Sequence, residues 1–244
     1  MGFEEVLRSA QDGDMAAQVA MGYMFYQGNG VVQDRREAAR WFGLAADQGS
    51  SEALCNLGYM RAHGEGMRAD LQKSIECYQK AAEMGNPRAM FNLGFMYTDV
   101  EGIEQDWEKA YHWYSKAADK GNLIALYRVA VMNEEGRGVP VKMKKAVEQY
   151  KICLDNDESR AGYRLGKIYQ EGRGKEIRAD PKKAADYFER SAELGDTKAM
   201  IEMARIYLSG NGRENDDNQA RMWLNKAILR GDEEAVAILN ELKD

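Results

Sequence analysis

One pattern of small and apolar residues recurs along the chain about every 36 residues. Successive copies are spaced by 36 residues, with a single spacing of 38. A fixed period in this range is typical of stacked repeats, in which each unit packs only on its neighbours. The sequence therefore predicts a repeat architecture without a single central core. The opening residue of each copy is Ala17, Ala53, Ala89, Ala125, Ala161, Ala199 or Ala235.

Each copy predicts two helices. In the first copy, Ala17, Met21 and Met24 recur at the spacing of a buried helical stripe. Glycines at 28 and 30 end this helix, and the Asp34 carboxylate is expected to cap the next one. The equivalent N-cap positions hold Asp34, Asp70, Asp106, Lys142, Asp180 and Asp216, and a bulky position in the second helix holds Trp41, Cys77, Trp113, Gln149, Tyr187 and Trp223.

The copies account for nearly the whole chain as one all-α solenoid of 14 helices without strands. Residues 1–16 form an expected N-terminal cap helix, residues 17–234 form six repeats, and residues 235–244 form a C-terminal cap helix. The two extra residues of the fifth repeat fall between Gly174 and Asp180, in the loop between its helices, where insertions are tolerated.

The repeated motif identifies a family resemblance. Ala-x3-Leu-Gly-x5-Gly-x-Gly, then Asp, then Lys-Ala-x2-Trp/Tyr-Tyr-x2-Ala-Ala-x2-Gly resembles the Sel1-like repeat, a relative of the tetratricopeptide repeat; the best copies begin at Ala53 and Ala89. The resemblance implies an α/α superhelix (solenoid) of helix-turn-helix units, whose first helices line a concave face. It also implies an adaptor that holds other proteins in complexes.

Some copies depart from this motif. Arg61 and Asn133 stand where the family usually has an aromatic residue. In the fourth repeat, Lys142 replaces the acidic N-cap and Asp157 replaces the terminal glycine. We expect the second and fourth repeats to pack less tightly or to serve binding.

The composition narrows the classes of partner. The net charge is −6, with 44% hydrophobic and 30% charged residues, which indicates an ordered chain and argues against a nucleic-acid binder. No run of about 18 apolar residues predicts a membrane span. The N-terminus is acidic and has no signal-peptide pattern. We expect a cytoplasmic protein of bacterial style, favouring a monomer; a removed signal peptide would make it periplasmic or secreted.

The face of the first helices opposite the buried stripe is the predicted binding groove. Aromatic residues and arginine dominate protein interfaces. We expect an extended peptide or helix there, with apolar residues on the aromatics and an acidic segment or C-terminal carboxylate on the cations. Two alternatives involve no ligand. Phe91, Tyr127 and Tyr163 would pack on a neighbouring repeat, and the cations would form local ion pairs. The candidate residues are Tyr23, Tyr26, Tyr59, Phe91, Phe95, Tyr127, Tyr163, Arg128, Arg164, Lys167 and Arg205.

Nothing in the sequence predicts catalysis, a cofactor or a metal site. The two histidines, His63 and His112, do not have the spacing of zinc ligands. Cys77 and Cys153 fall at buried positions, whereas Cys55 falls on the groove face, where a weak thiol role stays open. The sequence predicts a non-enzymatic adaptor for a protein or peptide. The alternatives are an inhibitor or immunity-type regulator of an enzyme, a hydrolase of bacterial wall compounds, and a structural spacer.

Overall fold

The computed structural model describes residues 2–173 and 176–242, apart from the side chain of Asp99. The loop predicted to carry the two extra residues includes Gly174 and Lys175, which lie outside the described residues, as do the ends of both predicted caps. The described residues form fourteen α-helices, which confirms the all-α solenoid. They are α1 (Phe3–Gln11), α2 (Met15–Gln27), α3 (Arg35–Asp47), α4 (Ser51–His63), α5 (Leu71–Glu83), α6 (Pro87–Asp99), α7 (Trp107–Asp119), α8 (Leu123–Glu135), α9 (Met143–Asp155), α10 (Ser159–Glu171), α11 (Pro181–Glu193), α12 (Thr197–Ser209), α13 (Asp217–Ile228) and α14 (Glu233–Glu241).

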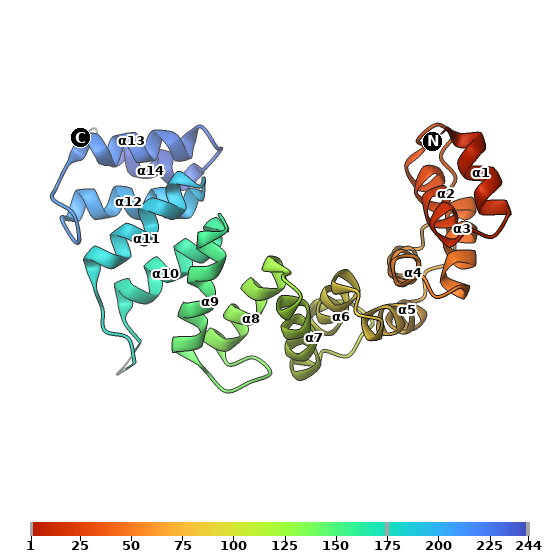
Figure 1. The fold of residues 1–244 in the computed structure, drawn as a ribbon. Helices are drawn as coiled ribbons and strands as arrows, with labels where there is room; N and C mark the ends of the chain where they lie inside the picture. Colours follow the sequence, from red (N-terminus) through yellow and green to blue (C-terminus); the bar gives the residue numbers. More distant parts are fainter. Residues whose placement is uncertain (1, 174–175, 243–244) are drawn as a thin grey trace. The chain divides into compact units, whose positions relative to one another are not determined.

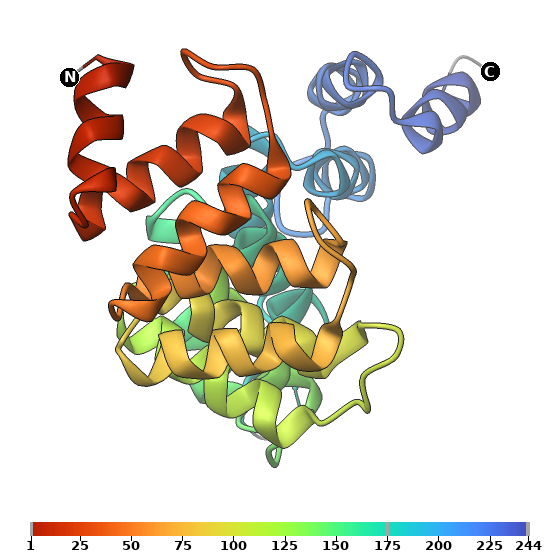
Figure 2. The ribbon, with the colours of Figure 1, turned by 90° about the vertical axis from the view of Figure 1, so that its right-hand side faces the viewer.

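The helices belong to two compact units, residues 1–125 and 126–244, with the division inside α8. Figures 1 and 2 show the helices within each unit stacked in chain order. Even-numbered helices are the first helices of the repeats and odd-numbered helices are the second. Within the first unit, α4 packs on α3 before it and on α5 after it. A first helix is therefore covered on two sides by second helices.

Side-chain caps explain where the helices begin. The Asp34 carboxylate accepts hydrogen bonds from the backbone N–H groups of Arg36 and Glu37, and Asp70, Asp106, Asp180 and Asp216 cap their helices in the same way. The predicted exception also holds, because Lys142 gives α9 no side-chain cap. Such a cap contributes about 1 kcal/mol of stability, so α9 begins without a signal that the other second helices have.

A close contact between a glycine and an aromatic ring joins the two helices of a repeat. A Cβ atom built on Gly22 would lie 2.5 Å from the Phe42 ring, and one on Gly94 would lie 2.6 Å from Tyr114. Gly58 with Tyr78 and Gly166 with Phe188 repeat the contact. The sequence predicted a bulky position at the row of Trp41, and Trp41 and Trp223 are buried there. The row that meets the first helix is Phe42, Tyr78, Tyr114, Tyr150, Phe188 and Leu224, all of them buried.

The fourth repeat departs from the others in its backbone as well as its sequence. Asp157 has φ +63°, and it is the one non-glycine residue with positive φ in the described chain. The equivalent turns use glycine, such as Gly121 at φ +86° and Gly195 at φ +98°. The Asp157 carboxylate lies 3.2 Å from an Arg190 nitrogen, but both side chains are more than half exposed, so this pair offsets little of the strain.

We expect Gly94→Val to lower the free energy of unfolding by about 1–3 kcal/mol, because the new side chain would overlap the Tyr114 ring. The matched control is Gly43→Val in α3, where a Cβ atom would meet no heavy atom within 4 Å. The control should change stability by less than about 0.5 kcal/mol. Urea unfolding of both variants makes the comparison, and equal losses would contradict the ring contact.

Asp157→Gly should raise the free energy of unfolding by roughly 1 kcal/mol, because glycine adopts positive φ without the clash of a Cβ atom. Arg190→Ala serves as the control, since it removes the exposed ion pair but leaves the backbone strained. A loss of stability in Asp157→Gly that matches the loss in Arg190→Ala would show that the ion pair outweighs the strain.

Candidate functional site

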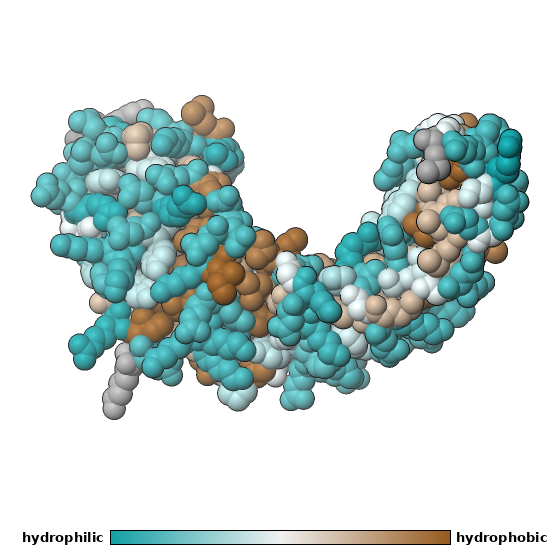
Figure 3. All heavy atoms as spheres, viewed as in Figure 1, coloured by the Kyte–Doolittle hydropathy of each residue, from teal (hydrophilic) through white to brown (hydrophobic). Residues whose placement is uncertain are grey.

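Side chains of α2, α3, α4 and the start of α6 enclose a pocket of about 200 Å³ in residues 1–125. Figure 3 shows tan and white residues of intermediate hydropathy over α2 and α4, among hydrophilic neighbours. Three of the aromatic residues predicted for the groove meet here. The lining consists of Tyr23, Tyr26, Gln27, Phe42, Asn56, Tyr59, Met60 and Arg88, and we call it the tyrosine pocket.

The aromatic walls of the tyrosine pocket are held in place by contacts with their neighbours. Tyr23 meets the Phe42 ring edge-on, with ring centroids 5.3 Å apart. The Arg35 guanidinium carbon lies 3.6 Å from the centre of the Tyr26 ring. Burial, followed by a hydrogen bond with Glu65, raises the pKa of Tyr26, so its hydroxyl stays protonated. Fixed rings offer contact area without the entropy loss of ordering flexible side chains.

The Tyr59 ring is the exposed wall of the pocket. It stacks on the His63 ring with centroids 4.1 Å apart, and 37% of Tyr59 is exposed. His63 also lies 2.9 Å from the Tyr59 carbonyl oxygen through its Nδ1 atom. The histidine therefore supports the tyrosine ring, and this is a structural role that the spacing of the two histidines did not predict.

A chain of hydrogen bonds runs along the polar side of the pocket. An Arg88 Nη atom donates to Asn56 Oδ1 at 2.5 Å, and the Asn56 amide nitrogen donates to the Tyr23 hydroxyl at 2.9 Å. The Tyr23 hydroxyl in turn donates to a Glu52 carboxylate oxygen at 2.9 Å. A guanidinium carries five N–H donors. Arg88 can therefore remain bound to Asn56 while it donates to a carbonyl or carboxylate of a ligand.

Cys55 lies beneath this chain, and its predicted place on the groove face is wrong. Only 1% of the residue is exposed, and its sulfur lies 3.9 Å from the Asn92 amide nitrogen. Burial raises the pKa of the Cys55 thiol, although Arg88 acts in the opposite direction. The thiol is therefore part of the packing and has no access to a ligand.

The two aromatic residues of α6 that were predicted for the groove do not line the tyrosine pocket. Phe95 is 48% exposed. Phe91 is half-buried and its ring lies 5.5 Å from that of Tyr114, the ring that packs on Gly94. Phe91 thus supports the contact between α6 and α7, whereas Phe95 is available on the surface.

In residues 126–244, the predicted aromatic residues belong mainly to the packing. Tyr127 is 7% exposed, with its ring 5.8 Å from that of Tyr150 and the Arg160 guanidinium 4.7 Å from its ring centre. Tyr163 is half-buried, with its ring 5.8 Å from that of Phe188. Tyr127 is therefore not exposed on a groove, and both residues repeat the supporting position of Phe91.

The predicted cations of this unit, except Arg128, which is exposed on α8, form ion pairs. Arg164 lies within 3.4 Å of Glu134 and 3.2 Å of Glu135, and Arg205 lies 3.2 Å from Glu202. Lys167 lies 3.6 Å from Glu171 and 3.9 Å from Glu202. The pairs join five cations to five carboxylates across α8, α10, α12 and α14, and we call them the charge network. Its members are Arg137, Arg164, Lys167, Arg173 and Arg205 with Glu134, Glu135, Glu171, Glu202 and Glu234.

Glu134 is the buried centre of the charge network. Its side chain is 7% exposed and accepts a hydrogen bond from the Tyr150 hydroxyl at 2.6 Å. Burial, with the Glu134 charge second, raises the pKa of Tyr150, so the phenol remains a donor. Arg164 and Arg173 both pair with this buried carboxylate. The sequence analysis missed these acidic partners.

Two other classes of site have no support in the described part of the chain. Residues 2–173 and 176–242 contain no group of three His, Cys, Asp or Glu side chains placed to hold a metal ion. Among the same residues, no helix combines the length and apolar character that crossing a bilayer requires.

Comparison with known proteins adds a family match. The model of the Sel1 repeat matches residues 16–50, 51–86, 87–122, 123–150, 159–196 and 197–232. The matched segments leave out 151–158, the end of the divergent second helix of repeat four. No match to the chain was found among curated proteins.

Solved structures also resemble the chain. A protective antigen present in uropathogenic Escherichia coli strains, which displays an SLR fold, is 31% identical with a TM-score of 0.88, over 97% of this chain and 50% of that one. The chain thus spans about half the length of that antigen. A Sel1 repeat protein from Oxalobacter formigenes is 29% identical with a TM-score of 0.72, over 88% of this chain and 85% of that one. An immunity protein from Pseudomonas aeruginosa is more distant, at 18% identity and a TM-score of 0.48 over 88% and 81%.

The hydrogen-bond chain predicts that Asn56 and Arg88 act together. Asn56→Ala should lower the free energy of unfolding by about 1–3 kcal/mol, because Asn56 is buried and its partners lose hydrogen bonds. In a double-mutant cycle measured by urea unfolding, Asn56→Ala and Arg88→Ala should show a coupling energy of about 0.5–3 kcal/mol. Arg128→Ala on α8 is the control and should be additive with Asn56→Ala. Additivity of Arg88→Ala as well would contradict the hydrogen-bond chain.

Proposed function

This chain belongs to the Sel1 repeat family, and we propose that it is a non-enzymatic adaptor that binds a protein partner at the tyrosine pocket. The observation that carries the proposal is the combination of three fixed tyrosines with Arg88 at the edge of one cavity. Aromatic side chains and arginine are the residues whose truncation most often weakens an interface. Pockets that bind small groups also combine apolar walls with a few converging polar groups.

The geometry supports recognition of an extended segment of the partner. An apolar side chain of that segment would enter between Tyr23, Tyr26 and Tyr59, above Phe42 and Met60. A backbone carbonyl or a carboxylate beside it would accept hydrogen bonds from Arg88, which Asn56 already orients. Because the walls are fixed before binding, most of the contact energy would appear as affinity.

The charge network makes an acidic ligand on residues 126–244 less favourable than the sequence suggested. Its five cations and five carboxylates balance, and Glu134 is buried among its partners. An acidic segment would have to break existing pairs to reach Arg164, Lys167 or Arg205. We therefore assign the network a role in partner selection, since fixed charges reject partners with like charges opposite them.

The state of the cysteines supports a binding role over catalysis. Cys55 and Cys153 are buried, and burial, with Glu158 second, raises the pKa of Cys153 to about 11. A raised pKa keeps these thiols protonated near neutral pH, and the thiol is a poor nucleophile. The three cysteines, all within the described residues, form no disulfide, which fits the cytoplasmic location that we propose for the adaptor.

A peptide selection tests the proposal. Displayed random peptides are selected on the wild-type protein, and their dissociation constants are then measured on Tyr59→Ala and Arg88→Ala. Each variant should bind at least about tenfold more weakly, which corresponds to roughly 1.4 kcal/mol. The matched control is His112→Ala, on the exposed side of α7, which should bind as the wild type does. Peptides that bind all three variants equally would place recognition outside the tyrosine pocket, and a selection that enriches no binder would count against the adaptor.

A further inference from the structure

A second pocket lies beside two positions that hold aromatic residues in most repeats. One position lies near the end of the first helix and the other lies in the middle of the second helix. In repeat five the two are Tyr169 and Tyr187, whose rings stack with centroids 5.5 Å apart. The pairs in repeats one, three, five and six are Phe25 with Trp41, Tyr97 with Trp113, Tyr169 with Tyr187, and Tyr207 with Trp223.

In repeats one and six, the second member of the pair is buried between consecutive second helices. Trp41 packs in one cluster with Ala10 of α1 and Met21 of α2, and it is 4% exposed. Trp223 packs in a cluster with residues of α11 and α12 and is also 4% exposed. A ring from the chain itself therefore occupies this place in those two repeats.

Repeats two and four replace both members with polar or small residues. In repeat four, Asn133 and Gln149 occupy the two positions, and the Asn133 amide donates to Gln149 Oε1 at 2.8 Å. The chain thus fills its own gap there with a hydrogen-bonded pair. In repeat two the same positions hold Arg61 and Cys77, neither of which is aromatic.

Repeat two has a pocket of about 420 Å³ beside these positions, at which repeats one, three, five and six carry aromatic residues. Ala39, Gly43 and Ala46 form its wall on α3, and a Cβ atom at Gly43 would meet no heavy atom within 4 Å. We call it the ring pocket. Its lining is Ala39, Gly43, Ala46, Asp47, Leu54, Leu57, Arg61, Met67, Lys73, Glu76, Cys77 and Lys80.

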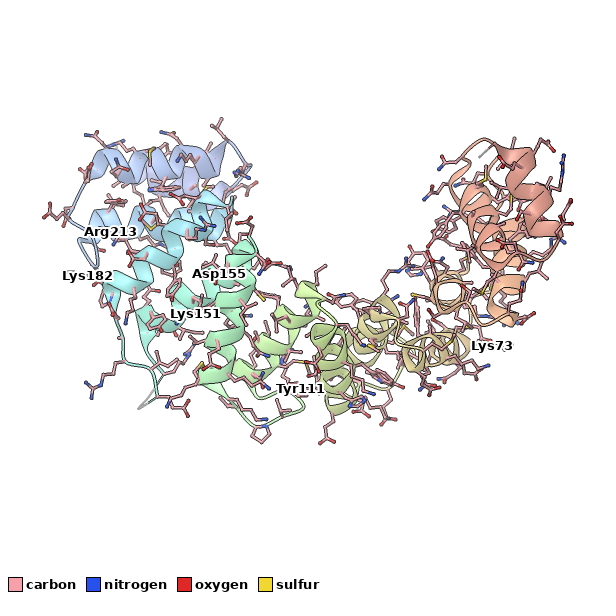
Figure 4. The ribbon with its side chains drawn as sticks, in the orientation of Figure 1. Lys73, Tyr111, Lys151, Asp155, Lys182 and Arg213 are labelled. Atoms are coloured by element: carbon pink, nitrogen blue, oxygen red, sulfur yellow. The ribbon has the colours of Figure 1, made fainter. Side chains whose placement is uncertain are left out.

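Arg61 lines the ring pocket beside Cys77, the residue that replaces the second ring. Burial raises the pKa of the Cys77 thiol, and the Arg61 guanidinium acts in the opposite direction, so the two side chains lie together. The Arg61 Nε atom itself is buried among protein atoms. Lys73 and Lys80 stand at the rim, and Figure 4 shows Lys73 projecting from the first turn of α5 to the surface.

We infer that the ring pocket binds an aromatic side chain of a protein partner, which takes the place of the missing ring of repeat two. The ring would lie against the small residues of α3, and Arg61 would stack on it as Tyr169 stacks on Tyr187 in repeat five. A guanidinium over an aromatic face is a favourable cation–π contact. This site is separate from the tyrosine pocket and does not depend on it.

Cys77 reports directly on occupancy of the ring pocket. It is half-buried and lines the pocket, whereas 1% of Cys55 and 0% of Cys153 are exposed. Alkylation of Cys77 by iodoacetamide at mildly alkaline pH is followed by mass spectrometry, with N-acetyl-tryptophanamide as the probe. The probe should slow Cys77 alkylation several-fold with a saturating dose dependence, and N-acetyl-leucinamide at equal concentration should have a much smaller effect. Equal protection by both compounds, or protection by neither, would overturn the inference.

Two filling variants test the shape of the ring pocket from opposite walls. Cys77→Trp restores the ring from α5, and Gly43→Leu fills the cavity from α3, where nothing obstructs a new side chain. Both should remove the saturation-transfer NMR signal of bound N-acetyl-tryptophanamide, and Cys77→Trp should also raise the melting temperature. Arg61→Met, which keeps the side-chain length without the guanidinium, should weaken probe binding at least threefold. A folded Gly43→Leu variant that binds the probe as the wild type does would overturn the inference even if Cys77→Trp fails to fold.

Discussion

The contact of an aromatic ring with a glycine determines how the two helices fit together in repeats one, two, three and five. Gly22, Gly58, Gly94 and Gly166 leave room for Phe42, Tyr78, Tyr114 and Phe188, so the helix axes approach closely at one defined rotation. Once that rotation is set, every other position of the first helix has a definite environment. The supporting rings such as Phe91 face the contact from one side, and Tyr59 is turned to the surface. The tyrosine pocket is a consequence of this rotation combined with tyrosine at three surface positions.

The repeat period, the caps and the helix ends could be predicted from sequence because each depends on residues close together in the chain. Asp34 caps residues two and three positions away, and Asp14 caps Ala17. It was harder to predict which side of a first helix is exposed, because second helices cover that helix from two directions. The buried arc is therefore wider than a single stripe, and it includes Cys55 and Tyr127, which the pattern placed on the groove. Tyr59 lies beyond that arc and is exposed, as its spacing indicated.

The ion pairs between repeats could not be predicted, because the partners of these cations lie almost one repeat away. The local pairs of Lys167 with Glu171 and of Arg205 with Glu202 agree with the alternative that the sequence left open. Arg164 and Glu134 are 30 residues apart, and Arg205 and Glu234 are 29 apart. A stripe of cations on one helix therefore looked like a site for an acidic ligand, although the adjacent first helix supplies the acids. In residues 1–125 the same distance separates Arg88 from Asn56 and Glu52 from Tyr23, with neutral partners in place of opposite charges. That difference leaves Arg88 with donors to spare, and it explains why the tyrosine pocket is the stronger candidate for recognition.

Both candidate pockets use α4, and they use different sides of it. Asn56, Tyr59 and Met60 line the tyrosine pocket, whereas Leu54, Leu57 and Arg61 line the ring pocket. An unfilled ring-sized space lowers stability, because its walls lose packing contacts. Repeat four, with a similar pair of polar replacements, closes the gap with the hydrogen bond between Asn133 and Gln149. Repeat two holds Arg61 and Cys77 at these positions, and the pocket that they line stays open. Repeat four thus closes the gap with its own side chains. Repeat two keeps a space, into which we propose that an aromatic side chain of another protein fits.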